Sequence, residues 1–243
     1  MVEYESFAYL DVPKTGSSFI TNFLREHCTE RQLNNKTHKG VKATYDPEKF
    51  YFISARNPLD QYISLYSFGC QNKGKLFLRA KKRDFDYFYD GTPERFRLWL
   101  GFMLDPENYE ELGAPGDDSW LRNVRRYIGF QSYRVLTLSV PKPRKLLADV
   151  TSEDAIRAVY RANNISRFTI RNETLRKDLA ELVSTRLQKS IRDHRSALEH
   201  IETAAPLNVS PRIDGMFERP RLDKQLQRLL EEREWLLHES FGY

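Results

Sequence analysis

The sequence predicts an α/β fold: one domain over residues 1–243, with a central, mainly parallel sheet flanked by helices. Short apolar runs that suit strands alternate along the chain with segments whose apolar residues recur at helical spacing. No repeat, low-complexity tract or long linker divides the sequence. Because ligands of such folds bind beyond the carboxyl ends of the strands, we expect the chemistry in the loops that follow them.

Four runs are predicted to form the strands of this sheet: residues 7–12, 50–55, 134–138 and 167–170. The first is an apolar run that ends at a Pro/Gly turn. The second consists largely of aromatic and β-branched residues, which favour strands, and it runs into Arg56-Asn57-Pro58. Both of these strands are predicted to lead directly into a helix.

The helices are predicted from apolar residues that recur every three or four positions. Those after the first two strands are marked by Phe19, Ile20, Phe23 and Leu24 and by Leu59, Tyr62, Ile63 and Tyr66. Further helices are predicted at 94–104, 152–162, 173–187 and 221–241. The last has the clearest pattern, since its leucines form one stripe and its charges lie on the other faces.

The composition excludes several classes of protein. Hydrophobic residues at 40% and charged residues at 30% are typical of a globular protein, not of a collagen-like, disordered or membrane-spanning one. The net charge of +5 is a mild basic excess that suits an anionic ligand without requiring one. Cys28 and Cys70 are too few for a disulfide scaffold, and no Cys/His spacing resembles a zinc site, so we expect no metal. The low cysteine count and an N-terminal segment that is acidic, unlike a signal peptide, together favour a cytoplasmic location.

The loop after the first strand has the residue types of a phosphate site. Pro13-Lys14-Thr15-Gly16-Ser17-Ser18 combines a lysine, hydroxyls and a glycine at a helix start, where backbone N–H groups face an anion. It is not a Walker A loop, because Lys14 precedes Gly16 instead of following it. An ordinary turn with a Ser or Thr N-cap is the alternative.

The loop after the second strand is a second candidate for binding phosphate. Arg56 ends the strand, and Ser64 follows eight residues later in the predicted helix. A guanidinium suits bidentate recognition of phosphate, and the hydroxyl adds a further hydrogen bond. The alternative is a surface arginine beside a proline that opens a helix.

Taken together, the two loops resemble those of the PAPS-dependent sulfotransferases. The resemblance implies that Lys14, Thr15, Gly16, Ser17 and Ser18 hold the 5′-phosphosulfate, and that Arg56 and Ser64 hold the 3′-phosphate. It also implies the P-loop-kinase-like sulfotransferase fold, and an enzyme that moves a sulfuryl group from PAPS to a hydroxyl and releases PAP without a metal.

Two later segments carry the same resemblance. Residues 206–212, Pro-Leu-Asn-Val-Ser-Pro-Arg, are similar to the loop that closes over the nucleotide in carbohydrate sulfotransferases, which implies donor-binding roles for Ser210 and Arg212. The end of the chain is similar to bacterial and Golgi-type members. A carbohydrate acceptor is therefore favoured, and a soluble catalytic domain of a longer Golgi-type parent is the alternative to a cytoplasmic enzyme. A glycan on the sequon at Asn208 would obstruct the nucleotide, which favours the cytoplasm.

His38 is the predicted catalytic base, because a base with a pKa near neutrality suits removal of a hydroxyl proton. Its context, Lys36-Thr37-His38, resembles the segment that holds the base in cytosolic sulfotransferases, although Lys39-Gly40 replaces the family's Leu-Pro. Glu30 and Glu48 are the carboxylate alternatives. The other histidines are expected on the surface or in solvated stretches: His27, His194, His200 and His238.

The acceptor is expected to be a small molecule or a glycan, either neutral or anionic, and not a nucleic acid. The basic residues at 79–83 and at Arg122, Arg125 and Arg126 predict either a solvated face or a groove for an anionic acceptor. The aromatic residues at 85–99 are either core or a surface for sugar rings. The alternative functions are a nucleotide-dependent, kinase-like phosphotransferase and a non-catalytic protein that binds PAP or nucleic acid.

Overall fold

The computed structural model describes residues 1–41, 45–108, 123–205 and 221–243. The chain divides into two compact units, each assembled from three segments. Unit 1 comprises Met1–Asn57, Val135–Lys142 and Ala162–Val209, and unit 2 comprises Pro58–Arg134, Pro143–Arg161 and Ser210–Tyr243. The single domain predicted for residues 1–243 stays a prediction.

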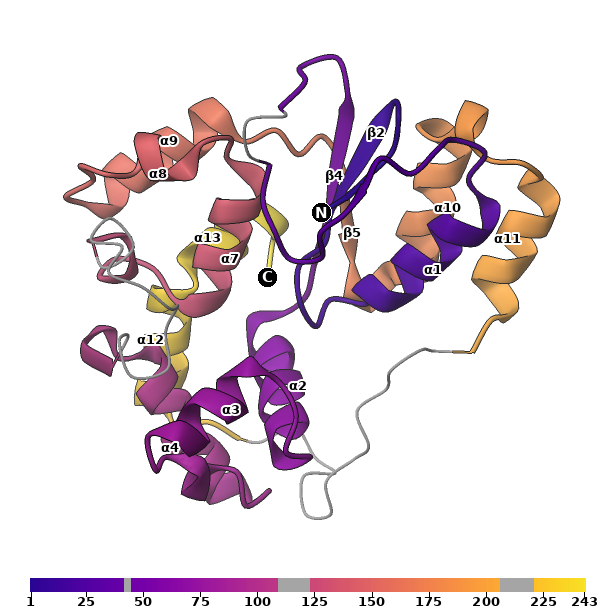
Figure 1. The fold of residues 1–243 in the computed structure, drawn as a ribbon. Helices are drawn as coiled ribbons and strands as arrows, with labels where there is room; N and C mark the ends of the chain where they lie inside the picture. The colour runs from indigo at the N-terminus through magenta and orange to yellow at the C-terminus, as the bar shows by residue number, and fades with distance from the viewer. Residues whose placement is uncertain (42–44, 109–122, 206–220) are drawn as a thin grey trace. The chain divides into compact units, whose positions relative to one another are not determined.

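Unit 1 contains a five-stranded sheet in the order β3-β1-β2-β4-β5, of which β2, β4 and β5 are labelled in Figure 1. The strands are β1 (Val2–Glu3), β2 (Phe7–Leu10), β3 (Asn34–Asn35), β4 (Phe50–Ala55) and β5 (Thr169–Arg171). β4 lies parallel to both β2 and β5, whereas β1 pairs antiparallel with β2 and with β3. The sheet is therefore mixed: the parallel centre agrees with the prediction, and the two short antiparallel strands were not predicted.

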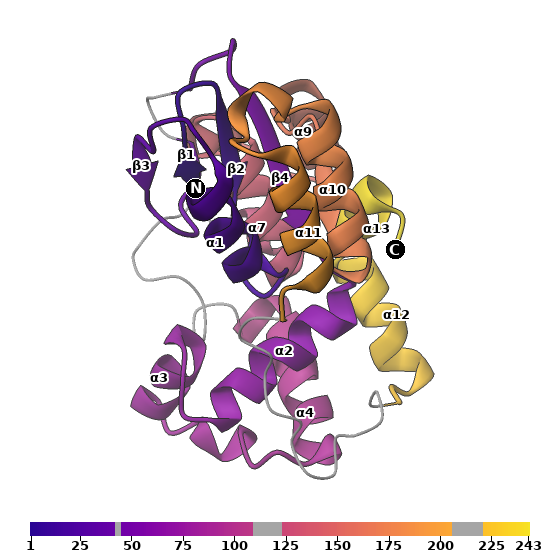
Figure 2. The ribbon, with the colours of Figure 1, turned by 90° about the vertical axis from the view of Figure 1, so that its right-hand side faces the viewer.

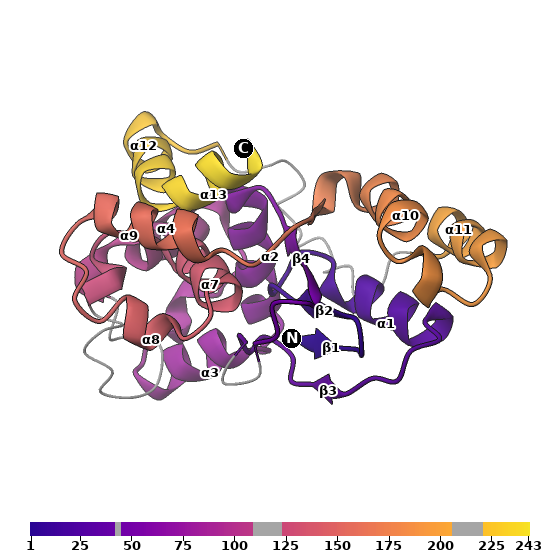
Figure 3. The same cartoon turned by 90° about the horizontal axis from the view of Figure 1, so that it is seen from above.

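Helices α1 (Ser17–His27), α10 (Leu175–Thr185) and α11 (His194–Thr203) lie together on one side of this sheet (Figure 3). Phe7, Tyr9 and Phe52 of the strands pack with apolar residues of the three helices in one buried cluster. Every residue of β2 is buried, as expected of a central strand covered on both faces. Because β2, β4 and β5 run parallel, the loops that follow them leave from the same edge of the sheet.

Unit 2 is helical. It contains α2 (Pro58–Cys70), α3 (Lys75–Lys82), α4 (Pro93–Leu104), α8 (Pro143–Leu146), α12 (Lys224–Arg233) and α13 (Trp235–Phe241), together with most of α9 (Glu153–Asn163) and the first half of α7 (Phe130–Ser139). Short 3-10 turns occur at Asp86–Phe88 and Pro106–Asn108 here, and at Asn172–Thr174 and Gln188–Ser190 in unit 1. Figure 2 shows α2 beside α3 and α4, with which it is in contact.

The aromatic residues of unit 2 form its core. Phe96 and Trp99 are fully buried, and the Trp99 indole N–H donates to the Tyr89 hydroxyl at 2.9 Å. Only part of the set, such as Tyr87, is exposed. The structure therefore favours the core interpretation over a surface for sugar rings.

Among the described basic residues of unit 2, the structure favours a solvated face over a groove for an anionic acceptor. Arg125 is only 3% exposed, and its guanidinium lies over the Phe130 ring at 5.5 Å. In α3, Phe77 and Ala80 are buried while the lysines face solvent, so this helix has an ordinary solvated face. Arg122 lies outside the described residues.

The strand predicted at 134–138 is wrong, because these residues belong to α7. The buried positions of this helix are Gln131, Ser132, Val135, Leu136, Leu138 and Ser139, which mostly recur at helical intervals. Polar residues occupy three of these six positions, so the sequence shows only the short apolar run, which periodicity alone cannot distinguish from a strand.

The helix predicted at 221–241 is interrupted. Glu234, at φ −103° and ψ 26°, departs from helical geometry and separates α12 from α13. None of the helices in the described parts of the chain is long and apolar enough to span a membrane.

Candidate functional site

The loop after β2 is fixed to the sheet by Thr15. This side chain is fully buried, and its hydroxyl donates to the Val12 carbonyl at 2.7 Å and lies 2.5 Å from the Ser54 hydroxyl of β4. The Tyr9 hydroxyl contacts the same Ser54 oxygen at 2.6 Å. Since its hydroxyl is used inside the protein, Thr15 can offer a ligand only its backbone N–H.

Gly16 allows the loop to turn into α1. It has a φ of 83°, in the left-handed region that favours glycine, and a Cβ added there would lie 2.3 Å from Cδ1 of Leu175. Among the described residues no side chain caps the start of α1, and its first turn holds no acidic residue. The first N–H groups and the positive end of the helix dipole are therefore available to an anion beside Ser17 and Ser18.

Two cationic residues come together at this edge of the sheet. The Arg56 guanidinium, which follows β4, donates through Nη1 to the main-chain carbonyl of Lys14 at 3.2 Å. Burial lowers the pKa of Lys14, and the charge of Arg56 lowers it further. A bound phosphate offsets this repulsion, because its negative charge favours both cations. Lys14 also has a φ of 67°, an uncommon conformation for a non-glycine residue.

The loop after β5 supports the loop after β4. The Glu173 carboxylate accepts a hydrogen bond from the Asn57 backbone N–H at 2.7 Å. Asn172 lies at the same place, with its Nδ2 atom 3.0 Å from a Cβ built on Gly16. Neither residue was predicted to take part in the site, since neither has a local motif.

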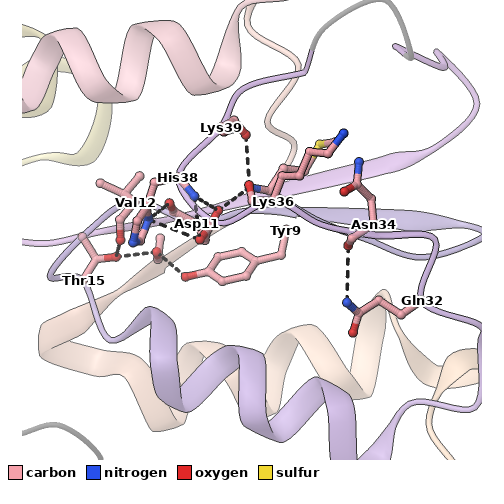
Figure 4. A network of polar contacts seen from close by, with 11 residues as sticks. Tyr9, Asp11, Val12, Thr15, Gln32, Asn34, Lys36, His38 and Lys39 are labelled. Carbon is pink, nitrogen blue, oxygen red and sulfur yellow. Dashed lines mark hydrogen bonds and ion pairs between the residues drawn. The ribbon is translucent and has the colours of Figure 1, made fainter. Parts of the chain in front are cut away.

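His38 is held beside the first loop by Asp11, the residue that follows β2 (Figure 4). Its Nδ1 lies 3.0 Å from the Asp11 carbonyl oxygen and 3.2 Å from a carboxylate oxygen, and its backbone N–H donates to both carboxylate oxygens at 2.9 and 3.0 Å. Because these oxygens only accept, the proton of the neutral imidazole lies on Nδ1. The Nε2 atom then carries the lone pair that a general base needs.

The structure gives less support to the two carboxylate alternatives. Glu30 accepts hydrogen bonds from the Ser6 backbone N–H and from the hydroxyls of Ser6 and Ser190, at 2.5 to 2.8 Å. Burial alone would raise the pKa of Glu30, but these hydrogen bonds lower it, which makes it a weak base. Glu48 is exposed in a turn that begins at Asp46.

The remaining predicted donor-binding residues are Ser64, Ser210 and Arg212. Ser64 is half-buried on α2, in unit 2, and Ser210 and Arg212 lie outside the described residues. The prediction that His27 is a surface residue is wrong, because it is only 7% exposed.

Residues 1–195 match the model of a protein family described as the sulfotransferase family. The chain belongs to the sulfotransferase family. This confirms the resemblance, and the match includes both phosphate-type loops and His38, while residues 206–212 lie beyond it. Family membership supports a sulfotransfer activity in general. Comparison with curated proteins and with solved structures gives no match.

Proposed function

We propose that this sulfotransferase-family chain moves a sulfuryl group from PAPS to an acceptor hydroxyl, preferably that of a carbohydrate, and releases PAP. The observation that carries the proposal is the contact between Lys14 and Arg56, which brings two cations from separate loops to one edge of the sheet, beside an uncapped helix start. A donor with phosphates at its 5′ and 3′ positions matches this pair of loops better than a nucleotide with a single phosphate chain.

The 5′-phosphosulfate is assigned to the first loop. Lys14 supplies the charge, and the N–H groups of Thr15, Gly16, Ser17 and Ser18 supply the hydrogen bonds. This division of roles agrees with the structure, in which the Thr15 hydroxyl is engaged with Val12 and Ser54. As the bond between sulfur and the bridging oxygen breaks, these groups stabilise the negative charge that develops on the leaving phosphate.

The 3′-phosphate is assigned to Arg56, with Ser64 as a second contact implied by the family resemblance. Ser210 and Arg212 are assigned to the nucleotide on the same ground. A 3′-phosphate distinguishes PAPS from ATP and ADP, so these residues would carry the selectivity for the donor.

The proton of the acceptor is assigned to His38. Asp11 holds Nδ1, so Nε2 accepts the hydroxyl proton as the acceptor oxygen forms its bond to sulfur. PAPS supplies the sulfuryl group, and the products are a sulfate ester and PAP. As in phosphoryl transfer, positioning and charge stabilisation supply most of the catalysis.

Arg56→Ala tests the donor site. We expect the affinity for PAP to fall about 10- to 150-fold, because a charge-assisted, bidentate contact contributes about 1.5–3 kcal/mol. The control is Arg31→Ala, which removes a highly exposed arginine from the same unit. Isothermal titration calorimetry measures the affinity of both variants for PAP. Equal affinities in the two would contradict the assignment of the 3′-phosphate to Arg56.

A further inference from the structure

A cluster of metal-ligating side chains lies away from the proposed donor site. The Nε2 atom of His27, on α1, lies 3.0 Å from Nδ1 of His200, on α11. The Glu26 carboxylate lies 4.0 Å from the same His27 atom and 3.6 Å from the same His200 atom. All three residues belong to unit 1. In the described part of the chain this is the one group of three or more His, Cys, Asp or Glu residues whose ligand atoms all come close enough to share one metal ion.

We propose that Glu26, His27 and His200 bind a divalent transition-metal ion, Zn²⁺ above all. The function proposed above does not require this site. Two imidazoles and one carboxylate are a donor set that Zn²⁺ uses, with a water molecule in the fourth position. Hard ions such as Mg²⁺ and Ca²⁺ prefer oxygen ligands and fit it poorly.

The separations between the ligand atoms are close to those of such a site. Tetrahedral zinc bonds of about 2.0–2.2 Å place neighbouring ligand atoms about 3.3–3.6 Å apart. The observed separations of 3.0, 3.6 and 4.0 Å bracket this range. Glu26 is the residue that adjusts, because its side chain is 61% exposed and can turn one oxygen toward both rings.

The two rings are already oriented for binding. They meet edge to face, at an interplanar angle of 87°, and Phe23 stacks on His27 and forms a T-shaped pair with His200 at 81°. Aromatic packing therefore fixes the direction in which each nitrogen points. When the metal binds, both facing nitrogens present lone pairs, so the ring that donates in the hydrogen bond between His27 and His200 carries its proton on its other nitrogen instead, and each neutral ring still holds one proton.

The site would connect the C-terminal end of α1 with α11. His27 closes α1, ten residues after the Ser17 that opens it, which is about 15 Å along the helix axis. At this distance the metal takes no part in the proposed transfer of the sulfuryl group. Its effect is to hold the end of α1 against α11, and therefore to stabilise unit 1.

Binding of Zn²⁺ and Co²⁺ by the full chain, freed of metal with a chelator, tests the proposal. We expect one Zn²⁺ per chain, a higher unfolding midpoint with Zn²⁺ but not with Mg²⁺, and a Co²⁺ absorption spectrum typical of four nitrogen and oxygen ligands. His200→Ala should weaken Zn²⁺ binding by at least about tenfold, the loss that even outer-shell substitutions produce. Glu26→Gln, at an exposed position, should also weaken Zn²⁺ binding.

The matched controls are His194→Gln and Glu202→Gln, both on α11 and outside the cluster. They should bind Zn²⁺ like the parent chain, and all four variants should bind PAP alike. The proposal is overturned if the parent chain binds neither ion, if Glu26→Gln and His200→Ala bind like the controls, or if Co²⁺ shows a thiolate band, which would move the ion to Cys28 or Cys70.

Discussion

At the scale of single residues, the contact between Asp11 and His38 determines which nitrogen of the imidazole is free. Asp11 is 1% exposed, and its carbonyl and carboxylate oxygens both lie near Nδ1. Asp11 therefore resembles the third member of a nucleophile–base–orienter arrangement, the group that orients the base. Asp11 is therefore a positioning residue in the proposed mechanism, and His38 is the residue that touches the acceptor.

His38→Ala should reduce turnover about 10²–10⁴-fold, the usual contribution of a general base, with PAP affinity unchanged. Asp11→Asn should reduce turnover less, and should cost nothing further when His38 is already alanine, because residues that act through one another are not additive. The assay is release of PAP from PAPS with a pool of unsulfated oligosaccharides. Glu48→Gln is the control. If Glu48→Gln loses turnover while His38→Ala stays fully active, the base is the Glu48 carboxylate and not His38.

His27 makes the stability of unit 1 depend on pH. Burial lowers its pKa from the usual 6.5, and the neighbouring His200 lowers it further. Glu26 and Asp193 oppose this shift, and Arg192 adds to it. Because the unfolded chain then binds the proton more readily than the folded chain, the free energy of unfolding is highest above about pH 6.5 and falls as the pH decreases below it.

Urea unfolding in EDTA between pH 5 and 8 measures this dependence. The slope contributed by one histidine is at most about 1.4 kcal/mol per pH unit. His27→Gln should make the stability less sensitive to pH in the acidic part of this range, whereas His194→Gln should leave the profile unchanged. A profile that is the same in His27→Gln and in the parent chain would contradict the assignment.

At the scale of elements, the parts of the fold that the sequence predicts well are those whose pattern is local. The aromatic run of β4 and the apolar spacing of α1, α4 and α10 appear in the structure within a few residues of their predicted limits. β1 and β3 contain only two residues each, too few to show a pattern. α7 was missed because polar residues occupy much of its buried face.

The break at Glu234 has a function in the packing of unit 2. The Glu234 carboxylate is fully buried and accepts hydrogen bonds from the backbone N–H groups of Gln131 and Ser132, at 3.1 and 2.6 Å, and from the Tyr62 hydroxyl at 2.5 Å. It therefore caps the first turn of α7 from a distant part of the chain. No local spacing indicates such a contact, so the sequence predicted one uninterrupted helix.

Glu234→Ala should lower the free energy of unfolding by about 3–5 kcal/mol, because it leaves three buried donors without an acceptor and removes the negative charge near the buried Arg233 guanidinium. The control is Glu232→Ala, which removes an exposed carboxylate paired with Arg228 and should cost no more than about 1 kcal/mol. Chemical denaturation followed by tryptophan fluorescence compares the two. Similar losses in both would show that the carboxylate of Glu234 adds no more than a surface charge.

At the scale of the whole molecule, the candidate site shows what a sequence reveals and what only folding brings together. Lys14, Gly16 and Arg56 were predicted from local motifs. Asp11 and His38 are 27 residues apart, Asn57 and Glu173 are 116 apart, and His27 and His200 are 173 apart. Contacts between such distant residues leave no spacing to detect in the sequence, so only the structure reveals the positioning residues and the proposed metal-binding cluster.

The proposed function requires that the two loops bind a nucleotide with a 3′-phosphate. Thermal unfolding of the full chain with PAP, and separately with ADP at the same concentration, tests this requirement. PAP at 100 times its Kd adds about 2.7 kcal/mol of stability, which corresponds to a rise of about 5–11 °C in the midpoint for a chain of this size. We expect this rise with PAP and little change with ADP. Equal shifts with both nucleotides, or no shift with either, would contradict the assignment of the donor.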